Sequence, residues 1–95
     1  MEERDEDDRG EVRLKEKGND RFKEGKYPEA VQWYTLALMQ APSNAILFGN
    51  RSTSFHQLNF YKLAILDAHT CTITDPTWFK GYLLKGKSLQ SLQMV

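Results

Sequence analysis

The sequence repeats itself with a period of 34 residues. Positions 34 apart carry the same kinds of side chain: a large apolar residue, a base, a small residue, then a tyrosine, two further small residues and a proline. The matched sets are Leu14, Phe48 and Tyr82; Lys17, Arg51 and Lys85; Gly18, Ser52 and Gly86; Tyr27 and Tyr61; Ala30 and Ala64; Ala37 and Cys71; Pro42 and Pro76. A period of this length indicates stacked supersecondary units that bury their apolar faces against one another.

Apolar residues at helical spacing, separated by turn residues, predict five helices. They span residues 11–24, 27–40, 45–57, 60 or 61–74, and 78 to about 94. The turns and breaks are expected at Gly25-Lys26, Pro42, Leu58-Asn59 and Pro76. The predicted fold class is therefore all-α, a solenoid of helical hairpins. It has two full repeats, at about residues 11–44 and 45–78, plus the first helix of a third repeat at 79–95.

Small residues at fixed positions predict close packing between the two helices of each hairpin. Gly18 lies inside the first expected helix, where a glycine costs about 1 kcal/mol relative to alanine. Its recurrence in register predicts that the second helix approaches it closely. That second helix carries a stripe at 3.6-residue spacing, formed by Ala30, Tyr34, Ala37 and Leu38. In the second repeat Ala68 replaces Tyr34, and we expect Phe60 or Leu63 to supply the missing packing.

The composition bounds the class of protein. Ninety-five residues of which 40% are hydrophobic make one small domain. No apolar run approaches the ~20 residues that span a bilayer, and no charged-then-apolar leader is visible at the N-terminus. Cys71 is the only cysteine, so no intrachain disulfide can form. A lone thiol suits a reducing compartment, and we expect a cytoplasmic protein.

The charges are unevenly distributed although the net charge is zero. Residues 1–9 carry six acids and two arginines, whereas residues 10–95 carry seven acids and eleven bases. We expect residues 1–10 to form a disordered acidic tail, which either keeps the protein soluble or folds back onto the basic body. The bases of the body are not clustered with interleaved aromatics, so nucleic acid is not an expected partner.

No catalytic or metal-binding set is visible in the sequence. His56 and His69 lie 13 residues apart without a cysteine or carboxylate at metal-ligand spacing. Cys71 is in register with Ala37 and is expected to be a small core residue. The glycines do not form a strand-to-helix phosphate loop. We therefore predict a protein that is not an enzyme and that uses no metal and no cofactor.

Four polar residues are predicted to converge on one groove. Lys15 and Asn19 are four apart and share one face of the first helix, and Asn50 and Lys80 lie on the third and fifth helices. In a stack of hairpins the first helices of successive repeats line a common concave surface. Two ammonium groups and two amides, without an acid on the same faces, suit a carboxylate ligand.

These segments resemble a known family. With its 34-residue period and its LKEKGN, FGNRS and WFKGY segments, the chain resembles the tetratricopeptide repeat family, in particular the carboxylate-clamp domains of chaperone adaptors such as the heat-shock organising protein. The resemblance covers residues 12–95. It implies binding of the C-terminal Glu-Glu-Val-Asp of the ninety- and seventy-kilodalton heat-shock chaperones. Lys15, Asn19 and Asn50 would hold the terminal carboxylate, and Lys80 an acidic side chain or backbone near it.

One clamp position departs from the family pattern. The family usually carries an arginine one turn after the lysine matched by Lys80, and here Leu84 stands at that place. Losing such a forked donor would cost on the order of 1.5–3 kcal/mol, roughly ten- to a hundredfold in affinity. Lys85 is a poor substitute because it points about 100° away around the helix. The alternative prediction is a scaffold or assembly segment of a larger protein, which interacts or self-associates through its uncovered, leucine-rich last helix.

Overall fold

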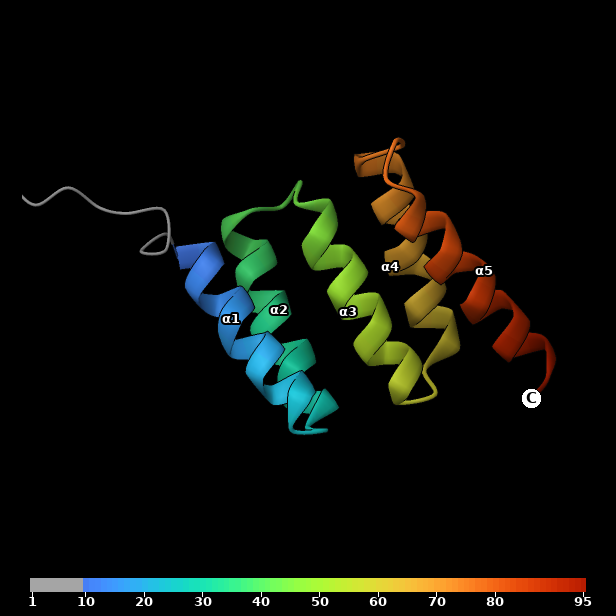
Figure 1. Ribbon diagram of the computed structural model, residues 1–95, viewed down its shortest axis with the longest axis horizontal. Helices are drawn as coiled ribbons and strands as arrows, with labels where there is room; N and C mark the ends of the chain where they lie inside the picture. Colours follow the sequence, from blue (N-terminus) through green and yellow to red (C-terminus); the bar gives the residue numbers. More distant parts are fainter. Residues whose placement is uncertain (1–9) are drawn as a thin grey trace, which may run out of the picture.

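A computed structural model describes residues 10–95, and the regular structure in this part of the chain is entirely helical (Figure 1). The helices are α1 (Gly10–Lys23), α2 (Tyr27–Gln40), α3 (Ala45–Gln57), α4 (Tyr61–Thr74) and α5 (Phe79–Gln93). All five were predicted, and the bounds agree to within one residue. The acidic tail was predicted at residues 1–10. Residues 1–9 lie outside the described residues, and Gly10 is the first residue of α1.

Local sequence signals explain where the helices end. Gly25 follows α1 with a φ of 76°, and Asn59, exactly one period later, follows α3 with a φ of 64°. Glycine and asparagine are the residues that enter this left-handed region most readily, which is why both end a helix. At the start of α3, the Asn44 side chain accepts a hydrogen bond of 3.2 Å from the backbone N–H of Leu47. Asn44 is thus the N-cap of α3, and it satisfies one of the free N–H groups of the first turn.

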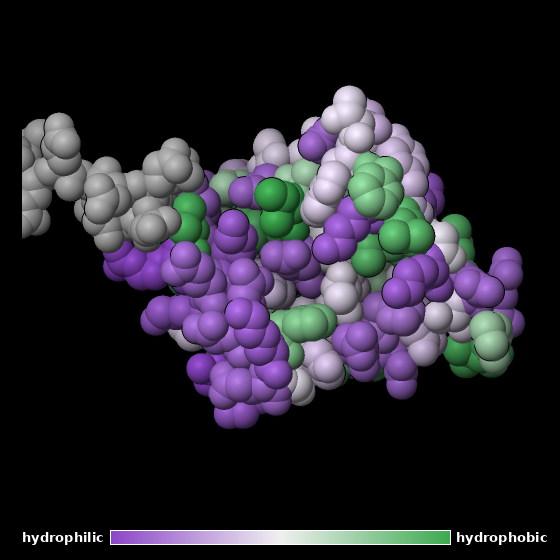
Figure 2. Space-filling model, in the orientation of Figure 1, coloured by the Kyte–Doolittle hydropathy of each residue, from purple (hydrophilic) through white to green (hydrophobic). Residues whose placement is uncertain are grey.

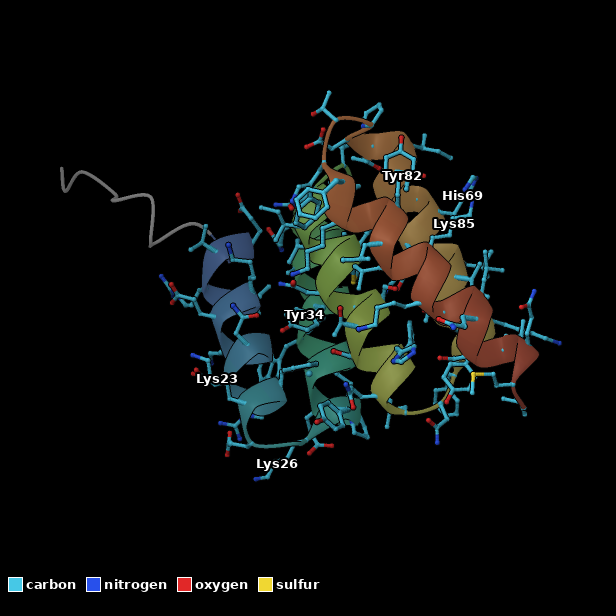
Figure 3. The ribbon with its side chains drawn as sticks, turned by 45° about the vertical axis from the view of Figure 1, so that its right-hand side comes forward. Lys23, Lys26, Tyr34, His69, Tyr82 and Lys85 are labelled. Carbon is cyan, nitrogen blue, oxygen red and sulfur yellow. The ribbon has the colours of Figure 1, made fainter. Side chains whose placement is uncertain are left out.

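The helices stack in chain order. Helices α1 and α2 form one hairpin, α3 and α4 form the next, and α5 packs against α4 and also touches α3. In Figures 1 and 3, α1, α3 and α5 lie side by side, with α2 and α4 behind them. The first helices of the successive repeats therefore share one side of the molecule, as predicted.

The first hairpin closes around Gly18. Its helix is held so close to α2 that a Cβ atom at Gly18 would lie 2.6 Å from Cε1 of Tyr34. The Tyr34 side chain is 2% exposed and belongs to the core cluster of this hairpin, with Ala30, Ala37, Leu38 and Leu47. The predicted reason for a mid-helix glycine is confirmed: only a residue without a side chain fits under the tyrosine ring.

The second hairpin carries different residues at the two positions of this contact. Ser52 stands in register with Gly18 and Ala68 in register with Tyr34, and both are fully buried. The Ser52 hydroxyl donates a 2.7 Å hydrogen bond to the carbonyl oxygen of Ala64. Phe60 and Leu63 are 53% and 46% exposed. The prediction that they compensate for the lost aromatic residue was wrong, because side chains that are about half exposed do not fill a buried position.

A partly buried ion pair joins three helices. The Arg51 guanidinium donates to both carboxylate oxygens of Asp67, at 2.7 and 2.8 Å, in the forked geometry that arginine favours. A third hydrogen bond, of 3.2 Å, runs to the Thr35 hydroxyl. Thr35 lies on α2, Arg51 on α3 and Asp67 on α4. The pair therefore closes the second hairpin and also fastens it to the first.

The surface changes in character along the stack. In Figure 2, polar side chains cover most of α1, and apolar patches lie among polar side chains nearer α5. None of the exposed large apolar side chains lies on α1, and seven lie on α4 and α5. The exposed large apolar residues of these two helices are Leu63, Leu66, Ile73, Phe79, Tyr82, Leu83 and Leu89. Among residues 10–95, none of the helices is long and apolar enough to cross a membrane.

Candidate carboxylate-binding site

Three of the four predicted site residues line one cavity. The cavity has a volume of about 220 Å³ and is bounded by Asn19, Phe22, Lys23, Tyr34, Asn50, Thr53 and Lys80. Asn19 comes from α1, Asn50 from α3 and Lys80 from α5, so the first helix of each repeat contributes one of the predicted residues. Lys15 lies one turn before Asn19 on α1 and is not among the lining residues. The structure thus brings Asn19, Asn50 and Lys80 together and leaves Lys15 beside the cavity.

The two amides are connected to each other and to a buried tyrosine. The Tyr34 hydroxyl donates a 2.6 Å hydrogen bond to Oδ1 of Asn19. Nδ2 of Asn50 donates to the same oxygen at 3.5 Å. Figure 3 shows Tyr34 in the space between α1 and α3. Side chains from three helices therefore meet at one oxygen atom.

The lining of the cavity is positive. It contains two lysines, Lys23 and Lys80, and no carboxylate. Nζ of Lys80 lies 5.8 Å from the centre of the Trp78 ring, within reach of a cation–π contact. The Trp78 ring in turn lies against α3, with Cζ3 only 3.3 Å from the place of a Cβ on Gly49. The Trp78 ring thus packs against the backbone beside Asn50. Because α5 begins at the next residue, Phe79, this contact positions the first turn of α5, which carries Lys80.

Burial keeps the tyrosine hydroxyl in its donor form. Burial raises the pKa of Tyr34 to about 12, because the charged phenolate would be poorly solvated there. The hydroxyl therefore stays protonated at any physiological pH. Its hydrogen bond to Asn19 is available whenever the protein is folded.

Comparison with known proteins places the chain in a family, although no family model matches it. The chain is 43% identical over 72 residues to "Hsp70-Hsp90 organizing protein 2" of Arabidopsis thaliana, covering 76% of this chain and 13% of that protein. The "Arabidopsis OM64 TPR domain" superposes with a TM-score of 0.86 at 30% identity over 90% of this chain and 70% of that one. The chain belongs to the tetratricopeptide repeat family.

A second solved tetratricopeptide domain carries a ligand. The first TPR of Spaghetti (RPAP3), bound to the HSP90 peptide SRMEEVD, has a TM-score of 0.86 and 33% identity, covering 90% of this chain and 68% of that one. The present tetratricopeptide chain spans only 13% of the length of its Arabidopsis relative, "Hsp70-Hsp90 organizing protein 2".

The position that departs from the tetratricopeptide clamp pattern is part of the core. Leu84 is 9% exposed, and its Cδ1 lies 3.6 Å from the place of a Cβ on Gly49. It does not line the cavity around Asn50 and Lys80. Lys85, the next residue, points to α4, where its Nζ lies 3.0 Å from Nδ1 of His69 (Figure 3). Neither residue brings a donor to the cavity of this tetratricopeptide domain.

Four lining residues were not predicted as part of the site: Phe22, Lys23, Tyr34 and Thr53. Two of them carried a signal, because Lys23 follows Asn19 by four residues and Thr53 follows Asn50 by three, so each shares a helix face with a predicted residue. Tyr34 was predicted only as a packing residue. Its polar role depends on the interhelical contact with Asn19, which helical periodicity does not define.

His56 and Cys71 do not line this cavity. Nε2 of His56 is 3.0 Å from the Ser91 hydroxyl. Cys71 is fully buried in the core, where burial raises the pKa of its thiol. Within residues 10–95, no group of three or more His, Cys, Asp or Glu side chains is placed to hold a metal ion.

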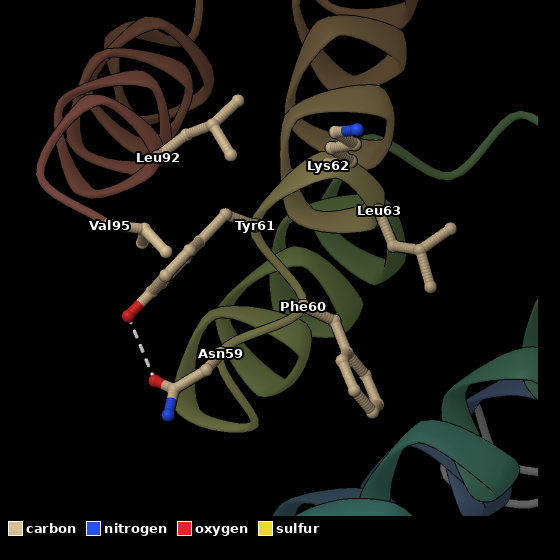
Figure 4. A pocket seen from close by; sticks show the side chains of 7 residues that line it. All are labelled: Asn59, Phe60, Tyr61, Lys62, Leu63, Leu92 and Val95. Carbon is tan, nitrogen blue, oxygen red and sulfur yellow. Dashed lines mark hydrogen bonds between the residues drawn. The ribbon is translucent and has the colours of Figure 1, made fainter.

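A larger cavity of about 490 Å³ lies between the start of α4 and the end of α5 (Figure 4). Its lining is Asn59, Phe60, Tyr61, Lys62, Leu63, Leu92 and Val95. In this cavity Tyr61 points toward Val95, and its hydroxyl donates a 2.9 Å hydrogen bond to Oδ1 of Asn59. Lys62 is its only charged residue, so the cavity suits apolar groups rather than a cluster of carboxylates.

Proposed function

We propose that this chain is an adaptor module that binds acidic C-terminal peptides ending in Glu-Glu-Val-Asp, and through them the ninety- and seventy-kilodalton heat-shock chaperones. The observation that carries the proposal is the single cavity where Asn19, Asn50 and Lys80 meet without a carboxylate in the lining. Amide and ammonium groups donate hydrogen bonds, and a carboxylate only accepts them. The peptide in the similar RPAP3 domain ends in the same four residues.

Each residue has a distinct role in this proposal. The amides of Asn19 and Asn50 donate to the terminal carboxylate of the peptide, and Lys15 adds charge from the adjoining turn of α1. Lys80 holds an acidic side chain or backbone group from the other side of the cavity. With Leu84 in place of a fifth donor, we expect micromolar affinity that falls as salt is added.

The proposed module acts by binding alone and catalyses no reaction. The organizing proteins that resemble it are named for the two chaperones that they organize. The cytoplasm is the compartment we propose for it, because its single cysteine, Cys71, is a free thiol.

Calorimetric titration with a pentapeptide ending in Glu-Glu-Val-Asp tests the proposal, with the C-terminally amidated peptide beside it. Only the free acid should bind, and Lys15→Ala or Asn50→Ala should remove the binding. Lys26→Ala is the matched control, because Lys26 lies in the α1–α2 connection, outside the cavity (Figure 3). Equal binding of both peptides, or an Asn50→Ala variant with unchanged affinity, would refute the clamp.

A second candidate function, assembly through α5, is favoured by the unfilled face of that helix. Phe79, Tyr82 and Leu83 are 73%, 52% and 54% exposed. Gly86 stands in register with Gly18, yet a Cβ on Gly86 would meet nothing within 4 Å, where Gly18 meets the Tyr34 ring. The face of α5 that corresponds to the α2-binding face of α1 is thus open to another helix.

Sedimentation equilibrium tests this second function. If α5 mediates self-association, the chain should form dimers at high concentration and Leu83→Asp should make it monomeric. Leu66→Asp, at an exposed leucine of α4, is the matched control and should leave the dimer intact. A strictly monomeric wild type at high concentration would exclude self-association through α5.

A further inference from the structure

A buried hydroxyl decides which end of an amide faces the proposed ligand. Tyr34 on α2 and Asn50 on α3 both direct hydrogen-bond donors at Oδ1 of Asn19, at 2.6 and 3.5 Å. The oxygen end of the Asn19 amide is therefore occupied by groups of the protein. The two hydrogens on Nδ2 of Asn19 are left for other partners.

The orientation of this amide matters because its two ends are chemically opposite. The nitrogen end donates hydrogen bonds and the oxygen end accepts them, while a carboxylate can only accept. An Asn19 side chain turned by 180° would present its oxygen to a carboxylate and repel it. Rotamer energies alone hardly separate the two orientations, because the terminal torsion of asparagine is broad. The choice must come from the neighbours of Asn19.

We infer that Tyr34 is a positioning residue of the proposed carboxylate site, whose hydroxyl holds Oδ1 of Asn19 so that Nδ2 faces the peptide carboxylate. The inference rests on the proposed function and names a residue that acts through another. Tyr34 lines the cavity, but the hydroxyl is engaged by Asn19. The contribution of the Tyr34 hydroxyl to the binding affinity is the free energy by which it favours the donating orientation of the Asn19 amide over the reversed one.

The tyrosine is held firmly enough for this task. Its side chain is 2% exposed, and its ring lies directly against the backbone of α1 at Gly18. Asn19 is the next residue along that helix. The contact that fixes the ring against Gly18 therefore also fixes the hydroxyl at a set distance from the Asn19 amide.

The chain contains its own matched control. The Tyr61 hydroxyl donates a 2.9 Å hydrogen bond to Oδ1 of Asn59, and neither residue lines the cavity of the proposed site. Tyr61 and Tyr34 thus both donate to the oxygen of an asparagine side chain. Removing the hydroxyl of Tyr61 deletes the same kind of bond without touching Asn19.

The experiment measures the affinity for the free-acid Glu-Glu-Val-Asp pentapeptide in wild type, Tyr34→Phe and Tyr61→Phe. Phenylalanine keeps the ring against Gly18 and removes only the hydroxyl. Because a neutral hydrogen bond contributes modestly, Tyr34→Phe should weaken the binding about three- to tenfold, while Tyr61→Phe should leave it unchanged. Thermal unfolding of each variant, followed by circular dichroism, reports whether the fold is retained.

A second readout separates positioning from a purely structural role. In an NMR titration of wild type, the side-chain NH₂ signal of Asn19 should shift when the peptide is added. Without peptide, the chemical shift of this signal should differ between wild type and Tyr34→Phe. In Tyr61→Phe it should stay at the wild-type position. A structural role would change stability without changing this signal selectively.

The outcomes are distinguishable. If wild type binds the free acid and Tyr34→Phe binds it equally well, the proposed function stands and the positioning role is refuted. If Tyr34→Phe binds more weakly but its Asn19 amide signal is unchanged, Tyr34 does not act through Asn19 and the inference is also refuted. If the wild type does not bind the free acid, the proposed function fails and the inference fails with it.

Discussion

Two glycines in the same register should respond in opposite ways to the same substitution. Gly18 and Gly86 both lie inside a helix, two periods apart. A Cβ on Gly18 would lie 2.6 Å from the buried Tyr34 ring, whereas a Cβ on Gly86 would meet nothing within 4 Å. We therefore expect Gly18→Ala to destabilise the protein and Gly86→Ala to stabilise it.

The magnitudes follow from two effects. Replacing glycine by alanine inside a helix contributes about 1 kcal/mol of stability at either position, through the lower entropy of the unfolded chain. At Gly18, overpacking against Tyr34 costs about 1–3 kcal/mol and outweighs that gain. The two variants should thus differ by about 1–3 kcal/mol, and by roughly 4–24 °C in Tm for a domain of this size.

Urea unfolding followed by circular dichroism measures both free energies of unfolding. The unfolded state gains the same methyl group in each variant, so the difference between them isolates the contact with Tyr34. If Gly18→Ala were as stable as Gly86→Ala, the close approach of α1 and α2 would not exist in solution. That result would also remove the anchor proposed for the Tyr34 hydroxyl.

Three further predictions concern buried groups. Asp67→Ala leaves the Arg51 guanidinium without its carboxylate and should lower the free energy of unfolding by about 3 kcal/mol in a urea titration; a loss below about 1 kcal/mol would contradict a structural role for the pair. The pKa of Tyr34 is raised from 10.0 to about 12, so its share of the stability is complete below pH 10 and is lost as the pH rises toward 12. The stability of wild type relative to Tyr34→Phe should fall over that range, and parallel curves would argue against a buried phenol. Because Cys71 is fully buried with a raised thiol pKa, it should react with a thiol reagent at neutral pH only as fast as the protein opens, and immediate reaction would contradict the packing.

Helix positions and faces were predictable because they depend on local spacing. Turn residues and apolar periodicity placed every helix end to within one residue, and the 34-residue register identified the reason for Gly18. The convergence of Asn19, Asn50 and Lys80 followed from the same register. These predictions needed only the helical period and the rule that stacked repeats present equivalent faces.

The failures concern contacts that cross between helices. The exchange of Gly18 and Tyr34 for Ser52 and Ala68 adds a small side chain to one helix and removes an aromatic ring from the other. Helical spacing does not show how the neighbouring side chains adjust, so Phe60 and Leu63 were wrongly expected to compensate. The hydrogen bond from Tyr34 to Asn19 depends on the rotamers and spacing of two helices. A general rule could have indicated it, since a buried tyrosine hydroxyl usually finds a partner.

The Arg51 ion pair has a consequence for the shape of the whole stack. Its guanidinium touches side chains of α2 and α4, so it fixes the angle at which the second hairpin leans on the first. Because the proposed peptide site takes residues from all three repeats, its width is a property of the curvature of the solenoid. A small tilt at this joint acts as a lever that moves Lys80 relative to Asn19. Ligand preference in such an array can therefore shift through a residue that never touches the ligand.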